Sequence, residues 1–534
     1  MNQRAGDPSP SSRLGMTLIA LLFIAAAVAF TQSYQRWLDP IIDTGRDLYI
    51  PEQIDHGARL YRDIRYQYPP LAPYALALMT GVVGHSLGSY TAIGLLQSIV
   101  IAAALWMIGR RTAGTIAGFA AAMFFVSLSF CGATTWGANF LFPYSYGATI
   151  GMALIVVSLA LFIYERPHLA LIPLFVATWC KVEYAMAAAI IIVALALVRR
   201  VSIRQIAFFA GAEVIAAAFA FWYFPHIRDN VFAESLTHGE SARQFFRTVS
   251  GVSDWQDFLT ASCIAIVALI AILWLLKSVR LTIAVPLVIA ISFLLPLKPH
   301  AFFRAFGILQ YIALIVGLRR RNATLVTLAA FSIATTLRVP LSVSPVWYGF
   351  ALIVPTYALI AYFLFDFLEL GSRAVWLLPL VVFLCGHDLL EQRARYAQKR
   401  FAIESSRGRF YDVNPDRAHA FNEFIHTVHG GTLAVFPEGL TLNYLTESRT
   451  TLTFHTFTPV ETAARDVEDA IIDELSKSPP DRVVILTRDV REYGYQGFGV
   501  DYDRHLLAYL GLAYQLTARW VGPRFQLILL TRST

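Results

Sequence analysis

Residues 145–163 read SYGATIGMALIVVSLALFI, a run without a charged side chain. A helix needs about 20 apolar residues to cross the hydrocarbon core of a bilayer. The run is therefore long enough to span a membrane, and its apolar residues surround the helix on all sides, as is typical of a helix that meets lipid. The run predicts a transmembrane helix. The recurrence of comparable runs along the chain predicts a fold made of such helices.

Comparable runs recur from the N-terminus to residue 390. Counted with residues 145–163, they predict about 13 transmembrane helices. The composition agrees, because 57% of the 534 residues are hydrophobic and 15% are charged, whereas soluble proteins carry about 25% charged residues. This excludes a disordered chain and disfavours a soluble enzyme, so the predicted class is a polytopic α-helical membrane protein. The further runs are 14–34, 88–109, 112–130, 168–181, 184–198, 205–224, 257–276, 281–297, 303–318, 323–337, 347–366 and 374–390.

The C-terminal part, residues 391–534, has a different pattern and predicts a compact α/β domain. Residues 1–390 form the transmembrane domain, with two long loops at 35–87 and 225–256. Val460–Ser476 in the C-terminal part has helical spacing of its apolar residues. The runs that favour strands are Thr432–Phe436, Arg482–Thr487 and Phe525–Thr531.

Basic residues predict the orientation, because cytoplasmic loops of membrane proteins carry an excess of Lys and Arg. With the N-terminus in the cytoplasm, all tight basic clusters between spans fall on the cytoplasmic side. An odd number of spans then places residues 391–534 outside, in the periplasm of a bacterial inner membrane. The basic excess of the chain thus records contact with a bilayer rather than nucleic-acid binding. The clusters are Arg110–Arg111, Arg166, Arg199–Arg204, Lys277–Arg280, Arg319–Arg321 and Arg373.

The first span has a second interpretation. Met16–Phe30 is short enough for the core of a signal peptide, and Ala27-Val28-Ala29 resembles a cleavage site. The long apolar body that follows favours a retained membrane anchor.

The first long loop carries ionisable and aromatic residues just beyond the first span. It contains Asp43-Thr44-Gly45-Arg46-Asp47, then Gly57-Ala58-Arg59-Leu60-Tyr61-Arg62-Asp63, then Tyr66-Gln67-Tyr68-Pro69-Pro70-Leu71. Ionisable groups at a membrane surface are functional candidates. The alternative is a solvated loop with helix-capping aspartates. The arginines of this loop either contact phosphate or are solvated, and because surface charges are common we favour solvation for each of them; they are Arg46, Arg59, Arg62 and Arg65.

This order of residues resembles the GT-C glycosyltransferases, polytopic enzymes that take a sugar from a polyprenyl-phosphate carrier. The nearest branch resembles the protein O-mannosyltransferases and the aminoarabinose lipid A transferases. The resemblance covers the topology of residues 14–390 and is specific over 43–71 and more loosely around 181–184. It implies that Asp43 is the catalytic base, with Asp47 as the second choice.

The sequence departs from the family pattern at two places. Many members have two adjacent acids where this chain has Asp43-Thr44, and some have a Lys before the Pro-Pro pair, where this chain has Tyr68. Both departures leave the identity of the sugar donor open.

The chemistry also calls for a carboxylate. A phosphate-linked sugar has a good leaving group, so what is needed is a base for the proton of the acceptor hydroxyl. A positioned carboxylate contributes about 10²–10⁴-fold. A single displacement at the anomeric carbon would invert its configuration.

The carrier phosphate needs cations. In the predicted topology, few basic residues of the helical body lie on the external side, against the usual bias. A bound phosphate explains them, since Arg grips phosphate bidentately and Lys acts as a point charge; the alternative is pairing with nearby acids or lipid head groups. The candidates are Lys181, Lys298, His300, Arg304 and Arg338.

Supporting roles fall to residues near these groups. Glu183 is placed to orient Lys181, and Asp63 is a secondary acid. Tyr61 and Tyr68 suit either an interfacial aromatic belt or a platform for sugar. Glu213, in the middle of a span, is expected to pack against another polar group.

No metal site is indicated, because the chain has no HExxH, Walker or C-x-x-C motif. Some GT-C enzymes use a divalent metal, so one is possible, but no cofactor is required by the residues. The predicted activity is transfer of a sugar from a polyprenyl-phosphate donor to a hydroxyl of a lipid, glycan or protein. The alternatives are a lipid or sugar transporter or flippase, and a noncatalytic scaffold. Transporters often show repeated halves and broken helices at mid-membrane. No repeated halves are evident here, and the polar residues cluster at one surface of the membrane, which favours an enzyme.

Overall fold

The protein is described from a computed structural model. The described residues are 10–42, 44–133, 138–233, 255–294, 299–337, 339, 348–367, 371–523 and 525–533.

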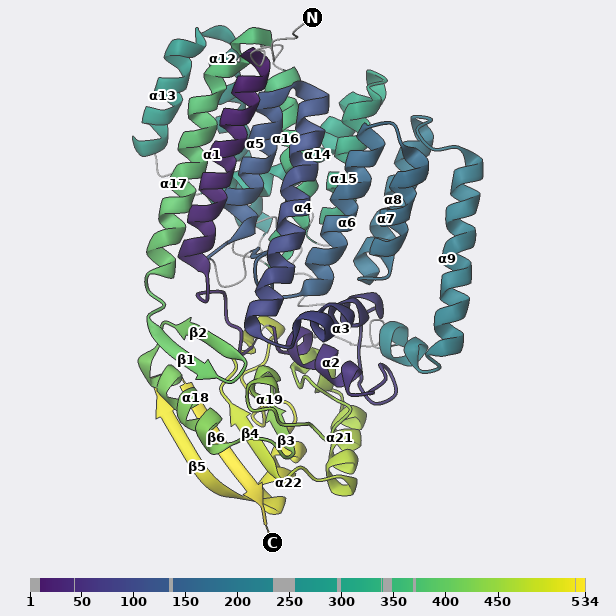
Figure 1. Ribbon diagram of the computed structural model, residues 1–534, viewed down its shortest axis with the longest axis vertical. Coiled ribbons are helices and arrows are strands. Elements are labelled where there is room, and N and C mark those ends of the chain that lie inside the picture. The colour runs from purple at the N-terminus through teal and green to yellow at the C-terminus, as the bar shows by residue number, and fades with distance from the viewer. Residues whose placement is uncertain are drawn as a thin grey trace, which may run out of the picture.

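Helices form the body of the molecule, and one lies at each predicted span (Figure 1). Within the described residues, six helical stretches are long and apolar enough to cross a membrane, among them α4, α6 and α9, and most of the others are shorter apolar helices. The chain is thus a helical polytopic membrane protein, while the count of 13 crossings stays a prediction. The helices at the predicted spans are α1 (Pro10–Ser33), α4 (Leu87–Ala113), α5 (Thr115–Phe125, continued as a π-helix over Val126–Phe130), α6 (Tyr146–Ile163), α7 (Pro167–Thr178), α8 (Val182–Leu197), α9 (Ile203–Tyr223), α12 (Trp255–Ser278), α13 (Leu281–Leu294), α14 (Pro299–Arg319), α15 (Ala323–Thr336), α16 (Val354–Tyr362) and α17 (Leu378–Tyr396).

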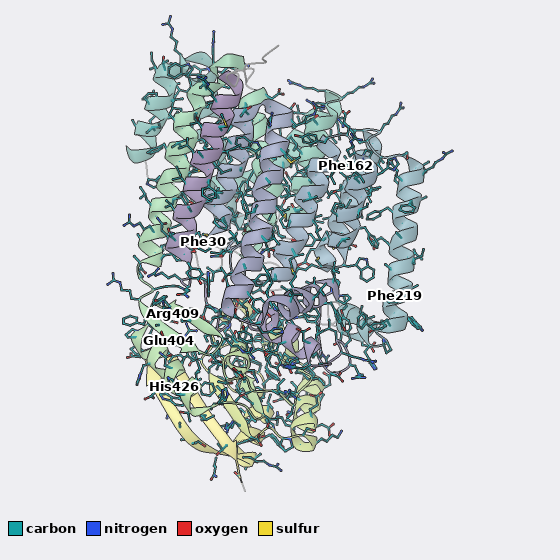
Figure 2. All side chains as sticks on the ribbon, viewed as in Figure 1. Phe30, Phe162, Phe219, Glu404, Arg409 and His426 are labelled. Atoms are coloured by element: carbon teal, nitrogen blue, oxygen red, sulfur yellow. The ribbon has the colours of Figure 1, made fainter. Side chains whose placement is uncertain are left out.

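Side-chain exposure separates a lipid-facing part from a water-facing part (Figure 2). Phe162 on α6 is 2% exposed inside the bundle, but Phe219 on α9 is 57% exposed at its outer edge. Glu404 and Arg409, which are exposed on the C-terminal region, form a 3.9 Å ion pair there. Large apolar side chains face outward on the helices because lipid covers them, whereas charged ones face outward on the C-terminal region.

Glu213 on α9 is bonded as expected. Its carboxylate accepts hydrogen bonds from the Thr178 hydroxyl at 2.8 Å and from the Trp179 indole N–H at 3.2 Å. These bonds tie α9 to the end of α7, so Glu213 is a packed partner of polar groups.

Two short helices lie between the bundle and the C-terminal region: α2 (Gly45–Asp55) and α3 (Leu71–Val83) (Figure 1). On α3, Leu76 is fully buried but Val82 is 81% exposed. An exposed apolar face of this kind suits a helix lying at a membrane surface.

The C-terminal region is mixed α/β. Its four-stranded sheet has the order β3-β4-β6-β5, with β3 parallel to β4 and the other neighbours antiparallel. The three predicted strands correspond to β3, β4 and β6. The elements are β1 (Phe401–Ser405) and β2 (Gly408–Asp412), which form a hairpin, α18 (Pro415–Thr427), β3 (Leu433–Phe436), α19 (Thr441–Leu445), α20 (Pro459–Thr462), α21 (Arg465–Lys477), β4 (Arg482–Leu486), α22 (Arg504–Ala513), β5 (Tyr514–Gly522) and β6 (Phe525–Arg532).

One predicted element is corrected. Val460–Ser476 is not one helix but two, because Ala464 is extended as the N-cap of α21. The hydroxyl of Thr462, the last residue of α20, donates to Asp503 at 2.6 Å. This bond fixes the end of α20 to the start of α22. It therefore helps to keep α20 and α21 separate helices.

The C-terminal region is joined to the first loop by partly buried polar contacts. Arg417 pairs with Asp39 at 2.7 Å and with Asp412 at 2.5 Å. Gly45 lies so close to Thr441 that a Cβ there would meet its backbone nitrogen at 2.6 Å. Residues 35–87 and the C-terminal region therefore form one layer, which we call the junction layer. The domain boundary at 390/391 stays a prediction, and α17 continues to Tyr396.

The basic turns lie at the opposite end of the bundle from the junction layer, as the ends of α4, α8, α12 and α14 show (Figure 1). This is the arrangement on which the orientation was predicted. The orientation itself, and the retention of the first span, stay predictions.

Candidate functional site

Several predicted site residues lie outside the described part of the chain. Asp43, Lys298 and Arg338 are among these, and of His300 and Arg304 only the backbone, in α14, is described. The site is therefore built here from Asp47, Lys181 and their neighbours.

Lys181 lies where the bundle meets the junction layer. It is the N-cap residue of α8 and is 6% exposed. Its Nζ lies 4.7 Å from the ring centre of Tyr68, which comes from the first loop. A buried ammonium over an aromatic face is stabilised by the ring, so Tyr68 holds the charge of Lys181 in place.

Arg46 approaches the same ring. Its guanidinium carbon lies 5.4 Å from the ring centre of Tyr68, and its side chain is 20% exposed. Our interpretation of Arg46 as a solvated charge is therefore wrong. No local signal could have corrected it, since the partners of Arg46 come from distant parts of the chain.

The charge of Arg46 is secured by its surroundings. Burial acts to lower its pKa, but the phenols of Tyr68 and Tyr144 and the carboxylates of Glu461 and Glu438 outweigh it and hold the pKa well above the ordinary value. Arg46 and Lys181 thus place two cations at one aromatic ring.

Asp47 lies beside these cations but is committed to a backbone contact. It is 9% exposed, and its Oδ2 accepts the N–H of Tyr146, the first residue of α6. Burial raises the pKa of Asp47, against the lowering effects of that hydrogen bond and of Arg46 and Lys181. Asp47 therefore caps α6, whose own N-cap, Ser145, makes no capping bond.

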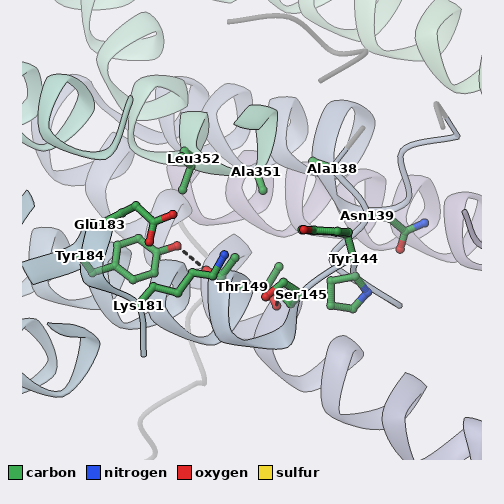
Figure 3. Close-up of a pocket in the computed structure, with 12 residues that line it drawn as sticks. Ala138, Asn139, Tyr144, Ser145, Thr149, Lys181, Glu183, Tyr184, Ala351 and Leu352 are labelled. Carbon is green, nitrogen blue, oxygen red and sulfur yellow. Dashed lines mark hydrogen bonds between the residues drawn. The ribbon is translucent and has the colours of Figure 1, made fainter. Parts of the chain in front are cut away.

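A pocket opens next to Lys181 (Figure 3), with a volume of about 520 Å³ counted to its open mouth. Ser145 and Thr149 belong to the start of α6, and Glu183 and Tyr184 to the start of α8. The N-terminal turns of two helices carry partial positive charge, and Lys181 adds a full one. The side of the pocket at Lys181 is therefore suited to an anion, while Glu183 adds a carboxylate to the lining. The role of Glu183 in orienting Lys181 stays a prediction.

Two other predicted residues have different surroundings. Asp63 accepts the N–H of Arg59 at 2.9 Å and pairs with exposed Arg62 at 2.6 Å, as in a surface turn. Tyr61 is 4% exposed and donates its hydroxyl to the carbonyl of Tyr68 at 2.7 Å. Tyr61 thus supports Tyr68, and its role in an aromatic belt or a sugar platform stays a prediction.

The C-terminal region supplies groups that sequence analysis left without a role. Glu438 and Glu492 flank Arg488, each at 2.8 Å. His455 lies near Arg46, and burial lowers the pKa of His455 to about 4, with Arg46 adding to the effect and a hydrogen bond at Thr453 opposing it. His455 is therefore neutral at pH 7. Only the fold could bring these groups to Arg46.

Glu461 is the carboxylate of this region that pairs with Arg46, at 3.9 Å. It lies on α20, which the bond between Thr462 and Asp503 anchors. Asp503 is 4% exposed. Burial raises the pKa of Asp503 to about 7, with Glu468 adding to the effect and the Thr462 hydroxyl opposing it.

Asp503→Asn should stabilise the protein at alkaline pH. Since the folded pKa lies above the unfolded one near 3.8, the folded state holds its proton more tightly, and stability falls as pH rises from about 4 to about 7. Asn keeps an acceptor for Thr462 without a charge. We expect the Tm of the variant to exceed that of wild type at pH 8 by at least about 3 °C, and by less at pH 5. Asp473→Asn, at an exposed site on α21, is the control; an Asp503→Asn difference that is independent of pH would contradict the assignment.

No group of three or more His, Cys, Asp and Glu suited to a metal ion occurs within the described ranges. The expectation that no cofactor is required stays a prediction.

No protein-family model matches the chain, and no curated protein matches it in sequence. Its fold, however, matches that of ArnT from Cupriavidus metallidurans bound to undecaprenyl phosphate, with 12% identity, 98% of each chain covered and a TM-score of 0.53. The same enzyme in the apo state gives the same values. The chain shares its fold with this enzyme.

This shared fold confirms, at the level of architecture, the resemblance to GT-C glycosyltransferases in the topology of residues 14–390. The more specific resemblance over residues 43–71 stays a prediction. An oligosaccharyltransferase from Archaeoglobus fulgidus also matches, with 12% identity, 88% of this chain and 69% of that chain covered and a TM-score of 0.48. That likeness is too weak to carry an argument. At such low identity the GT-C fold fixes the arrangement of helices and not the substrate.

Proposed function

We propose that the protein is a membrane glycosyltransferase that moves a sugar from a polyprenyl-phosphate donor to a hydroxyl of a lipid, glycan or protein. The observation that carries the proposal is the pairing of Lys181 and Arg46 at Tyr68, beside a pocket that is lined in part by the N-terminal turns of α6 and α8. This pairing occurs in a fold shared over 98% of the chain with an enzyme whose structure holds undecaprenyl phosphate.

The donor phosphate would bind at the cations. Lys181 would act as a point charge and Arg46 as a planar fork that can hold two phosphate oxygens. The N-terminal dipoles of α6 and α8 would add to the attraction. Lys298, His300, Arg304 and Arg338 remain further candidates from the sequence.

Asp43 would act as general base. The acceptor hydroxyl oxygen attacks the anomeric carbon and its proton passes to the carboxylate of Asp43, while the bond between that carbon and the phosphate oxygen breaks. The polyprenyl phosphate leaves with the bonding electrons, and the configuration inverts. Asp47 is less suited to this role, because its Oδ2 caps α6.

The setting we propose is a bacterial inner membrane, with the N-terminus in the cytoplasm and residues 391–534 in the periplasm. The active site then faces the periplasm. No nucleic acid is expected as a partner, and neither metal nor other cofactor is assigned to the reaction.

The test is a reconstitution into liposomes with a polyprenyl-phosphate sugar labelled in the sugar. Transfer of label to a hydroxyl acceptor from cell-envelope lipid, glycan or protein is expected. Movement of the intact donor across the bilayer without transfer would mean a flippase. If neither occurred, the protein would be a noncatalytic scaffold, and the proposal would be wrong.

A further inference from the structure

One carboxylate of the C-terminal region, that of Glu461, contacts both Arg46 and the segment that contains Tyr68. Glu461 Oε1 lies 3.9 Å from Nη1 of Arg46 and accepts a hydrogen bond from Nε2 of Gln67 at 2.6 Å. The hydroxyl of Thr458, the N-cap of α20, donates to Oε2 at 3.2 Å. The side chain of Glu461 is 15% exposed. It therefore links the start of α2, the segment before Pro69-Pro70 and the C-terminal region.

Both contacts bear on Tyr68. Gln67 directly precedes Tyr68, so a hydrogen bond that fixes Gln67 also limits the movement of the Tyr68 backbone. Arg46, the other partner of Glu461, lies over the Tyr68 ring. Removing Glu461 would release the guanidinium and the ring together.

Glu461 is the carboxylate of the C-terminal region that forms an ion pair with Arg46. Glu438 also acts on Arg46, but it is bound to Arg488 at 2.8 Å, a cation that it shares with Glu492. A half-buried cation without a counter-charge is unfavourable. Glu461 supplies a counter-charge for Arg46.

The distance between the Glu461 carboxylate and the Arg46 guanidinium matters as much as the charge of the carboxylate. At 3.9 Å the two groups lie beyond hydrogen-bond range, which ends near 3.2 Å for N–H···O. Glu461 therefore stabilises the charge of Arg46 but takes none of its N–H donors. Those donors stay open to an anion as far as Glu461 is concerned.

We propose that Glu461 is a positioning residue for the donor phosphate, which holds Arg46 and Tyr68 in place from the C-terminal region. The inference rests on the proposed function. It makes the C-terminal region part of the donor site rather than a separate module.

Glu461→Gln tests the inference. The donor KM should rise about tenfold, equivalent to ~1.4 kcal/mol of binding, with kcat nearly unchanged, and the Kd of the purified protein for undecaprenyl phosphate should rise in parallel. Glu447→Gln is the matched control, because Glu447 makes an ion pair of nearly equal length, 3.8 Å, with Arg407 in the same layer. Its KM and Kd should stay at the wild-type values.

A double-mutant cycle separates positioning from general damage. If Glu461 acts through Arg46, then Glu461→Gln should raise the Kd no further in an Arg46→Ala background. Additive effects, an unchanged Kd, or tighter binding by Glu461→Gln would each overturn the inference; the last would mean that Glu461 competes with the phosphate.

Two safeguards keep the test decisive. Thr458→Val removes one bond to Glu461 and keeps the carboxylate, so it should raise the Kd in the same direction but less, even if Glu461→Gln folds poorly. The Kd for undecaprenyl phosphate needs no transfer reaction. Wild-type protein that binds this lipid but transfers no sugar would contradict the proposed function and leave the role of Glu461 measurable.

Discussion

Asp43→Asn is expected to abolish measurable sugar transfer, with a loss of about 10²–10⁴-fold in kcat. The amide keeps the size and polarity of the side chain but cannot take a proton at neutral pH. Donor binding should persist, because Asn leaves the cations at Tyr68 unchanged. The measurement is kcat with saturating labelled donor in liposomes, together with the Kd for undecaprenyl phosphate.

Asp47→Asn is the informative comparison for Asp43. Its amide oxygen can still accept the N–H of Tyr146, so the cap of α6 is retained, and we expect activity within about tenfold of wild type. Exposed Asp473→Asn controls for the loss of a charge as such. Full activity in Asp43→Asn with none in Asp47→Asn would reverse the assignment of the base.

Lys181→Met is expected to weaken donor binding by about 10- to 100-fold, because a hydrogen bond to a charged group contributes about 1.5–3 kcal/mol. Met has a similar length and suits a site that is 6% exposed, so the fold should be kept. The effect should appear in donor KM and in the Kd for undecaprenyl phosphate. Lys181→Arg should restore part of the affinity.

The control for Lys181 is Lys477→Met on α21, whose side chain is 71% exposed. It should bind and transfer as wild type does. Unchanged KM and Kd in Lys181→Met would show that the charge beside the pocket serves the fold alone, and the phosphate would have to bind elsewhere.

The helical body was predictable because lipid imposes a simple rule. Each apolar run long enough to approach a bilayer thickness coincides with a helix, from α1 to α17. The strands β3, β4 and β6 were predictable for a similar reason, since they are apolar and largely buried.

Sequence analysis missed the strands that are polar or that lie at the edge of a sheet. The hairpin of β1 and β2 has a mostly exposed or half-buried pattern and reads as a loop. The edge strand β5 is exposed along most of its length for the same reason. Such strands form because a neighbour supplies hydrogen bonds, and hydropathy records only burial.

The site was predictable in its residue types but not in its contacts. The sequence indicated Lys181 from its place outside the membrane against the charge bias. Arg46 gave no such sign, since its burial depends on Tyr68 and Glu461, which the fold alone brings near. The capping of α6 by Asp47 is also a contact between distant segments.

The most direct test of the account is an experimental structure of the protein with undecaprenyl phosphate. We predict that its phosphate lies within about 3 Å of Nζ of Lys181 and of the Arg46 guanidinium, at the pocket beside Tyr184, with the carboxylate of Asp43 facing the same space. A phosphate bound at the opposite end of the bundle, or an Asp43 carboxylate turned away from the lipid head, would contradict it.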